Sequence, residues 1–228
     1  YMAEYIESYF GDGSRLGIPI SYVRELSPAG TGGAIKLAER LLTETFLVCN
    51  ADIVYDINFR KLIAFHRKEA AAVTIAVKKV KNPSAYGVVK TNADDRVMAF
   101  LEKPISSLKN APAYINAGIY VCEPEVLVMM PKRKVVSLER DVFPSLIEAN
   151  VKVAAYKDDS YWIDIGTVKK YRELHEDIFS GKHKVAGVKF DKDGIFIGEK
   201  ATIDPHAQII GPVYMGPGVL VGANCIIG

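Results

Sequence analysis

Apolar runs alternate with amphipathic stretches from Gly17 to about Phe179. Short apolar runs predict strands, whereas apolar residues spaced three and four positions apart predict helices. The predicted strands are 20–23, 46–49 (buried), 73–77, a short run at Val88, 97–101, 114–122 and 151–156. The predicted helices are 2–10, 34–42, 59–69, 138–149 and 167–179. This alternation predicts an α/β fold, with a doubly wound, mixed, Rossmann-like sheet covered by helices on both faces.

A different period begins near the end of the chain. Aliphatic residues recur there at intervals of six, at Ile197, Ile203, Ile209, Met215, Val221 and Ile227. Small or aliphatic residues follow the first five of them by four positions, at Ala201, Ala207, Val213, Val219 and Cys225. Inward aliphatic residues and small corner residues with this period are typical of a left-handed parallel β-helix. The sequence therefore predicts two domains, 1–180 and 193–228, joined by a linker over 181–192.

Composition restricts the class of partner. A net charge of +2 argues against a dedicated nucleic-acid surface. No apolar run reaches membrane-spanning length, so we expect neither a membrane span nor a signal peptide. Cys49, Cys122 and Cys225 are odd in number and far apart, which predicts neither a disulfide framework nor a zinc site. We expect a protein of the reducing cytoplasm.

Three short motifs end successive apolar runs of the first domain. They are Tyr86-Gly87-Val88-Val89, Phe100-Leu101-Glu102-Lys103-Pro104 and Ile115-Asn116-Ala117-Gly118-Ile119-Tyr120. Gly87 lets the backbone approach a ligand, Lys103 offers a point charge to a phosphate, and Asn116 both donates and accepts hydrogen bonds. Glu102 can accept hydrogen bonds from two sugar hydroxyls. In this order the motifs predict a pocket for a polyhydroxylated, phosphorylated ligand. Taken alone, Glu102 and Lys103 fit better as exposed charges before a turn.

A glycine-rich segment, Gly30-Thr31-Gly32-Gly33, precedes the predicted helix 34–42. Glycines at such a place let backbone amides approach a ligand at the positive end of the helix. The segment is not a P-loop, because no Gly-Lys-Ser/Thr follows, and it is not G-x-G-x-x-G. A helix start capped with Thr31 nearby fits the segment equally well.

Two aspartates lie where predicted elements end. Asp52 follows the strand 46–49, and Asp164 comes shortly before the helix 167–179. Two carboxylates near a polyphosphate make a magnesium site, because Mg²⁺ takes its other ligands from phosphate and water. As alternatives, Asp52 fits a turn and Asp164 fits a helix cap. Trp162, the only tryptophan in the chain, is expected to wall the pocket.

Together these motifs resemble the NDP-sugar pyrophosphorylases, which are sugar-1-phosphate nucleotidyltransferases. The resemblance covers nearly the whole chain, including the β-helix. It implies that backbone groups of Gly30, Thr31, Gly32 and Gly33 bind the nucleotide base. It implies a sugar site made of Tyr86, Gly87, Glu102, Lys103, Asn116 and Trp162. It also implies that Asp52 and Asp164 hold Mg²⁺ and are catalytic together with Lys103.

The implied reaction joins a nucleoside triphosphate to a hexose-1-phosphate. An oxygen of the sugar phosphate attacks the α-phosphorus, and pyrophosphate leaves. Positioning and charge neutralisation dominate such transfers. The stretch from Val136 to Pro144 resembles that of mannose-1-phosphate guanylyltransferases, so GDP-mannose is the expected product. Glucose-1-phosphate thymidylyl-, uridylyl- or adenylyltransferases remain alternatives.

One part of the family pattern has no match. The family begins with a strand, a glycine-rich loop that carries an arginine, and a Lys-Pro motif. Both ends of this sequence look cut, since Tyr1 precedes Met2 and Gly228 falls inside the repeat. We therefore expect the 228-residue chain to be inactive by itself. The alternative is a non-catalytic relative that binds a sugar nucleotide and regulates.

The β-helix is expected to mediate a homo-oligomer, because an open aliphatic end is costly to leave in water. An acyltransferase of the hexapeptide type is a third hypothesis and the weakest. It needs a catalytic histidine, and His206 is expected to be an exposed corner residue. His66, His175 and His183 are expected at the surface.

Overall fold

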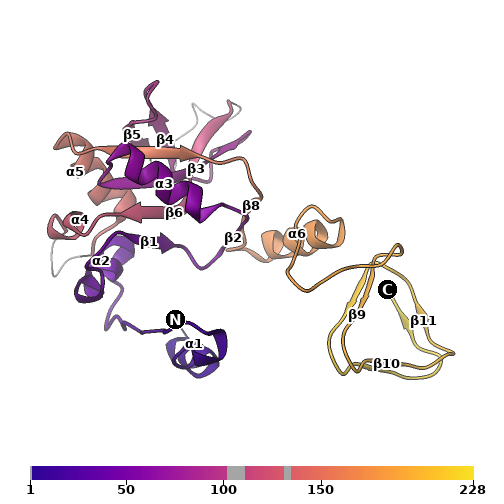
Figure 1. Cartoon of the computed structure of the whole chain (residues 1–228). Coiled ribbons are helices and arrows are strands. Elements are labelled where there is room, and N and C mark those ends of the chain that lie inside the picture. Colours follow the sequence, from indigo (N-terminus) through magenta and orange to yellow (C-terminus); the bar gives the residue numbers. More distant parts are fainter. Residues whose placement is uncertain (1, 102–110, 131–134) are drawn as a thin grey trace. The chain divides into compact units, whose positions relative to one another are not determined.

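The computed structural model describes residues 2–101, 111–130 and 135–228. The chain divides into two compact units (Figure 1). One unit consists of residues 1–51 and 57–159, and the other of residues 52–56 and 160–228.

The first unit is built on a mixed sheet, which has six strands within the described residues. Five lie side by side in the order β5 (Val97–Leu101), β4 (Val88–Thr91), β6 (Ala113–Cys122), β3 (Val73–Val80) and β7 (Val153–Lys157). The sixth, β1 (Phe46–Cys49), is antiparallel to the second half of β6. β3 is antiparallel to β6 and parallel to β7. The predicted mixed sheet is confirmed, with β6 at its centre.

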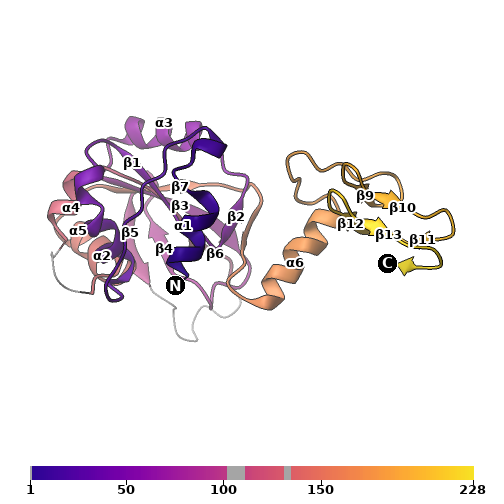
Figure 2. The same ribbon diagram turned by 90° about the horizontal axis from the view of Figure 1, so that it is seen from below.

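Helices cover both faces of this sheet, as predicted (Figure 2). On one face lies α3 (Phe59–Glu69), whose Leu62 and His66 are buried. The opposite face carries the larger core, which includes Val73 and Ile75 of β3. The elements that enclose this core are α2 (Gly30–Leu37), α4 (Glu125–Val128), the π-helical turn η3 (Leu138–Val142) and α5 (Phe143–Glu148).

The prediction of a strand at 20–23 is wrong. The structure describes these residues, and they belong to no strand. They follow α1 (Ala3–Phe10) and the short η1 (Ser14–Leu16), and their hydrogen bonds go back to the turn between those elements. Ile20 N donates to the Asp12 carbonyl at 2.9 Å, and the Tyr22 hydroxyl donates to the Gly11 carbonyl at 2.6 Å. An apolar run forms a strand only where a partner strand is available.

Two helices begin or end at other residues than predicted, and one predicted strand is less buried than expected. Helix 34–42 instead starts at Gly30, ends at Leu37 and continues as η2 (Glu39–Leu41). The stretch 138–149 is split into η3 and α5, because Pro144 has no N–H for a continuous α-helical ladder. The strand 46–49 forms as predicted, but Leu47 and Cys49 are exposed while Phe46 and Val48 face the core.

The second unit contains two short strands, a helix and the β-helix. β2 (Ile53–Tyr55) and β8 (Trp162–Asp164) form an antiparallel ribbon. Helix α6 (Val168–Phe179) follows, and the Thr167 side chain caps its start by accepting from Lys170 N. The described helices of both units are too short or too polar to cross a bilayer.

The β-helix is confirmed as parallel coils. Its first coil consists of β9 (Ile195–Ile197), β10 (Thr202–Ile203) and β11 (Gln208–Ile209), which form the three sides of a triangle (Figure 1). The second coil consists of β12 (Val213–Met215), β13 (Leu220–Val221) and β14 (Ile226–Ile227). Each strand of one coil pairs in parallel with the strand eighteen residues away in the other. Three hexapeptides therefore make one coil, and Val213, Met215 and Val221 are buried in the apolar interior of the β-helix.

Candidate functional site

Asp52 and Asp164 meet at one end of the ribbon formed by β2 and β8. The antiparallel register places Ile53 opposite Asp164, so Asp52 lies one residue beyond the pair. Ile165 N donates to the Asp52 carbonyl at 2.8 Å, which extends the pairing past the end of β8. The pairing of these two short strands therefore brings together two aspartates that are far apart in sequence.

Gly166 shows that the two carboxylates face a common point. A Cβ atom added to Gly166 would lie 3.0 Å from Asp164 Oδ1 and 3.4 Å from Asp52 Oδ2. Gly166 N also donates to Asp164 Oδ1 at 2.8 Å. The missing side chain leaves room beside both carboxylates. Because the cap of α6 is Thr167, the alternative interpretation of Asp164 as the helix cap is wrong.

This donor set fits a magnesium ion. Mg²⁺ typically takes one or two carboxylates from the protein and completes its shell with phosphate oxygens and water. Across the part of the chain that the structure describes, no group of three or more His, Cys, Asp or Glu residues could hold a metal. The pair therefore suits an ion that arrives with, or is completed by, a phosphorylated ligand. Trp162, two residues before Asp164 in β8, is on the same side of the ribbon.

The opposite end of the ribbon is anchored by a polar cluster that the sequence did not reveal. Asp56 N donates to the Tyr161 carbonyl at 3.0 Å, and the Tyr161 hydroxyl donates to Asp177 Oδ2 at 2.8 Å. Lys182 Nζ donates to both oxygens of Asp177 at 2.9 Å. The ring of His183 stacks on Tyr161 with centroids 4.5 Å apart. These contacts attach α6 and the turn after it to the ribbon.

Replacing Asp177 with asparagine is expected to lower the free energy of unfolding by about 1–2 kcal/mol at neutral pH. Burial alone would raise the pKa of Asp177, but hydrogen bonds from Lys182 and Tyr161 outweigh burial and lower it. Because the pKa of Asp177 is lower in the folded than in the unfolded protein, its carboxylate stabilises the folded state at any pH above the unfolded-state pKa. This stabilisation is lost as the pH falls through the folded-state pKa. The difference between variant and wild type should therefore shrink below about pH 4. Thermal melts of wild type and variant at a series of pH values measure this difference in stability. Glu176→Gln, at an exposed position of the same helix, is the control. A difference that does not change with pH would contradict the prediction.

In the first unit, two of the three sugar-pocket motifs are adjacent. Asn116 N donates to the Gly87 carbonyl at 2.8 Å, and Val88 pairs with Ile115. Tyr86 lies in the turn before them, where its N donates to the Pro83 carbonyl at 3.0 Å. Glu102 and Lys103 lie outside the described residues. The sheet thus brings Gly87 and Asn116 together, although Asn116 lies inside β6 and not at the end of an apolar run, as the sequence had indicated.

The side chain of Asn116 is held by two hydrogen bonds. Its Oδ1 accepts from Gly118 N at 3.0 Å, and its Nδ2 donates to the Tyr120 hydroxyl at 2.7 Å. Gly118 has a φ of +73°, and a Cβ there would lie 2.9 Å from Asn50 Nδ2. Glycine is therefore required at 118, both by its backbone conformation and by the close approach of Asn50.

The glycine-rich segment packs against residues 136–139. Gly32 N and Gly33 N donate to the Val136 carbonyl at 2.8 and 3.1 Å. Thr31 lies inside α2, where its Oγ1 donates to Glu139 Oε2 and accepts from Leu138 N, both at 2.9 Å. The alternative of Thr31 as a cap of this helix is wrong, because no side chain caps its start. The amides of Gly32 and Gly33, which were expected to approach a ligand, serve this contact instead.

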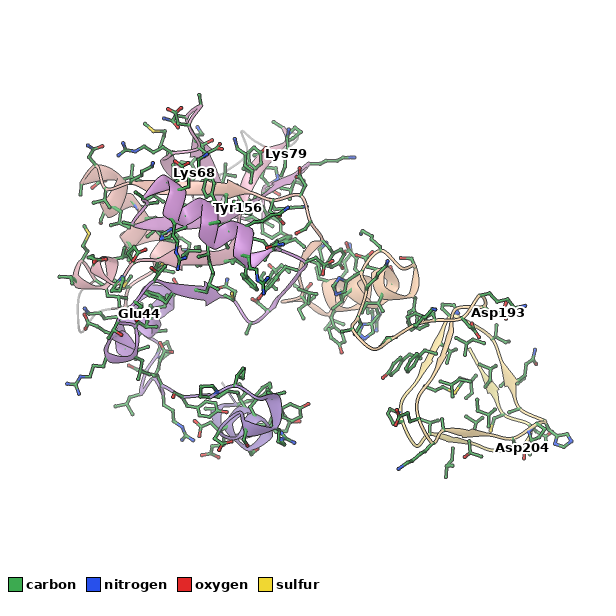
Figure 3. All side chains as sticks on the ribbon, in the orientation of Figure 1. Glu44, Lys68, Lys79, Tyr156, Asp193 and Asp204 are labelled. Carbon is green, nitrogen blue, oxygen red and sulfur yellow. The ribbon has the colours of Figure 1, made fainter. Side chains whose placement is uncertain are left out.

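The histidines divide into two groups. His66 is 1% exposed and lies within hydrogen-bonding distance of Thr74 and Glu123, so its prediction as a surface residue is wrong. His183 is also largely covered, by its stacking on Tyr161. His175 is exposed, as predicted. The side chain of His206 is 77% exposed, as predicted, and its Nδ1 lies 3.1 Å from Oδ1 of Asp204, which Figure 3 labels at a corner of the coil.

Comparisons with known proteins agree with this architecture. Residues 1–181 match the family model described as Nucleotidyl transferase, and residues 194–228 match Bacterial transferase hexapeptide (six repeats). The chain therefore belongs to the nucleotidyl transferase family, with hexapeptide repeats at its carboxyl end.

Two curated relatives show which nucleotidyl transferases the chain is similar to. The chain is 37% identical to a mannose-1-phosphate guanylyltransferase of Mycobacterium tuberculosis, over 97% of this chain and 62% of that protein. It is 30% identical to a UTP–glucose-1-phosphate uridylyltransferase of Synechocystis, over 100% of this chain and 66% of that protein. The chain thus spans less than two thirds of either relative.

Among solved structures, HddC from Yersinia pseudotuberculosis complexed with GMP-PN matches with a TM-score of 0.66 and 26% identity, over 78% of this chain and 75% of that one. A putative glucose-1-phosphate thymidylyltransferase from Bacillus anthracis matches with a TM-score of 0.68, over 83% of this chain and 74% of that one. At 17% identity, this second likeness supports the fold alone.

Proposed function

We propose that the protein transfers a nucleotidyl group from a nucleoside triphosphate to a hexose-1-phosphate, with GTP and mannose-1-phosphate preferred. One observation carries the proposal: in a chain of the nucleotidyl transferase family, Asp52 and Asp164 meet beside Gly166. Paired carboxylates suit a reaction whose main requirement is neutralisation of phosphate charge. The 37% identity with a mannose-1-phosphate guanylyltransferase supports the choice of substrates.

The proposed roles follow from the chemistry of each residue. Asp52 and Asp164 would hold Mg²⁺, which supplies charge neutralisation at the phosphates when bound. Lys103 places its ammonium group at the sugar phosphate, and Glu102 accepts hydrogen bonds from sugar hydroxyls. Gly87 and Asn116 contribute backbone and amide groups to the sugar, with Tyr86 beside them. Trp162 would offer an aromatic surface on the same side of the ribbon as Asp164. The segment from Gly30 to Gly33 contributes backbone groups to the base, except for the amides of Gly32 and Gly33, which bind the Val136 carbonyl. The reaction needs little proton transfer, so orientation dominates.

Equilibrium binding tests the choice of substrate without turnover. Isothermal titration of the full-length protein with GDP-mannose, UDP-glucose, dTDP-glucose and ADP-glucose compares the four products directly. The proposal predicts the tightest binding for GDP-mannose. Tighter binding of UDP-glucose or dTDP-glucose contradicts the guanylyl assignment, and binding of none of the four contradicts the proposed function.

We also propose a cytoplasmic homo-oligomer assembled through the β-helix. The three cysteines are free thiols, which suits a reducing compartment. The outward positions of the second coil are apolar and exposed: Tyr214 49%, Leu220 79% and Ile226 69%. In the first coil, Thr202 and Gln208 occupy the positions aligned with Leu220 and Ile226. On the third side, Tyr214 stacks on Phe196 of the first coil, so Leu220 and Ile226 are the apolar outer positions that the second coil alone presents. Exposed apolar positions of this kind favour contact with a second copy.

Replacing both Leu220 and Ile226 with aspartate is expected to lower the oligomeric state, because the charges would be desolvated in the contact. Multi-angle light scattering coupled to size exclusion measures the mass. Thr202→Asp, at the aligned outward position of the first coil, is the matched control and should leave the mass unchanged. Equal masses for the wild type and the double variant would show that these positions make no contact between copies.

A further inference from the structure

Glu139 is the acceptor of three hydroxyl groups from different parts of the first unit. Its Oε2 accepts from Thr31 Oγ1 at 2.9 Å and from Ser137 Oγ at 2.8 Å. Its Oε1 accepts from the Tyr120 hydroxyl at 3.1 Å. The carboxylate thus joins α2, the segment before η3 and the central strand β6. An ionised carboxylate can only accept, so all three hydroxyls must donate to it.

This fixed direction of donation extends to Asn116. Tyr120 is fully buried, and burial together with the Glu139 charge raises the pKa of its phenol, which stays protonated. Because its hydrogen points to Glu139, the Tyr120 oxygen is left to accept from Asn116 Nδ2. The Asn116 oxygen therefore faces Gly118 N, which needs an acceptor. The orientation of the Asn116 amide is therefore set jointly by the Gly118 N–H and by Glu139 acting through Tyr120.

We propose that Glu139 is a positioning residue for hexose-1-phosphate recognition, because it fixes the Asn116 amide through Tyr120. The inference rests on the proposed function, in which Asn116 contacts the sugar. Glu139 has no contact with substrate in this account. It belongs to the stretch from Val136 to Pro144 that resembles the guanylyltransferases, so the inference gives that stretch a physical role.

The substitution Glu139→Gln separates this role from general stability. Glutamine has one acceptor oxygen, and we expect it to stay with Thr31 and Ser137, since the reverse arrangement would deprive two hydroxyls of their acceptor. The amide nitrogen of the new side chain then faces Tyr120, and the phenol hydrogen loses its acceptor. It regains one only if the Asn116 amide turns over, which places Nδ2 against the Gly118 N–H. Turning over reverses the Asn116 amide; without it, the Tyr120 oxygen must accept from two amide groups at once, which weakens its bond to Asn116 Nδ2. Thr31 stays satisfied in both cases.

Kinetics on the full-length protein give the first test. Glu139→Gln should raise the KM for hexose-1-phosphate roughly tenfold, while the KM for the triphosphate changes little. Tyr120→Phe cuts the connection between Glu139 and Asn116, so Glu139→Gln should add no further increase in that background. Glu148→Gln, an exposed glutamate at the end of α5, is the control. If both KM values rose equally, and if the increase from Glu139→Gln added to that from Tyr120→Phe, Glu139 would have a general structural role and the proposal would be overturned.

The side-chain amide of Asn116 gives a second test that needs no turnover. In spectra of protein labelled with ¹⁵N at asparagine, the Asn116 cross-peaks should move in Glu139→Gln and stay in place in Glu148→Gln. Unmoved peaks overturn the proposal even if the kinetics change. Moved peaks with no activity in wild type would support the control of Asn116 by Glu139 and contradict the proposed function instead. The two failures are therefore distinguishable.

Discussion

Replacing either Asp52 or Asp164 with asparagine is expected to lower kcat roughly 100- to 1,000-fold, the range seen when one electrostatic stabiliser of a transition state is removed. The physical reason is the convergence of both carboxylates beside Gly166. An asparagine keeps the shape of the site and removes one charge from the pair that would hold Mg²⁺. Binding of Mn²⁺, followed by electron paramagnetic resonance, should weaken in parallel.

The same substitutions should not destabilise the fold, in contrast to their effect on kcat. Two carboxylates that face one point repel each other, so removing one charge should leave the melting temperature unchanged or slightly raise it. Asp94→Asn, in an exposed turn, is the control and should change neither kcat nor Mn²⁺ binding. A variant of Asp52 or Asp164 that unfolds at lower temperature but keeps its turnover per folded molecule would show that the residue is only a turn residue.

Gly30→Ala is expected to lower the free energy of unfolding by roughly 2–5 kcal/mol, from left-handed backbone strain and from overpacking. Gly30 has a φ of +78°, which an alanine adopts only at a cost. Its Cβ would also lie 2.5 Å from the Val136 carbonyl oxygen, a backbone atom that moves only with its segment. That carbonyl accepts from both Gly32 and Gly33, so the start of α2 should shift as well.

Urea denaturation measures this loss. Gly222→Ala is the matched control, because a Cβ there meets nothing within 4 Å. This substitution should leave the free energy of unfolding nearly unchanged. A Gly30→Ala variant as stable as Gly222→Ala would mean that the segment does not hold this conformation against Val136.

The residues alone pointed to each aspartate of the site, whereas their sharing of one ion was expected only from the family resemblance. Asp52 follows an apolar run and Asp164 precedes a helix, and both positions carry a signal in the sequence. The strands that unite them, β2 and β8, have three residues each, which is too short for a periodic pattern. The contact between the two strands depends on long-range pairing, so the positions of the aspartates in the sequence indicated a metal site without its geometry.

The glycine-rich segment shows a different limit of sequence analysis. Glycines before a predicted helix indicated a loop whose backbone amides approach a ligand. The group that approaches Gly30 and Gly32 is the Val136 segment, which lies far along the chain. His66 illustrates the same difficulty, because its partners Thr74 and Glu123 come from separate elements. By contrast, the six-residue period of the β-helix is local, and the structure reproduces it coil by coil.

The central claim is nucleotidyl transfer to a hexose-1-phosphate, and pyrophosphate release by the full-length protein tests it most directly. GTP, dTTP, UTP and ATP should each be paired with mannose-1-phosphate and with glucose-1-phosphate in the presence of Mg²⁺. The account predicts the highest kcat/KM for GTP with mannose-1-phosphate, and a large loss in Asp52→Asn. A preference for UTP or dTTP would contradict the guanylyl assignment alone. No pyrophosphate with any of the eight pairs would contradict the claim itself.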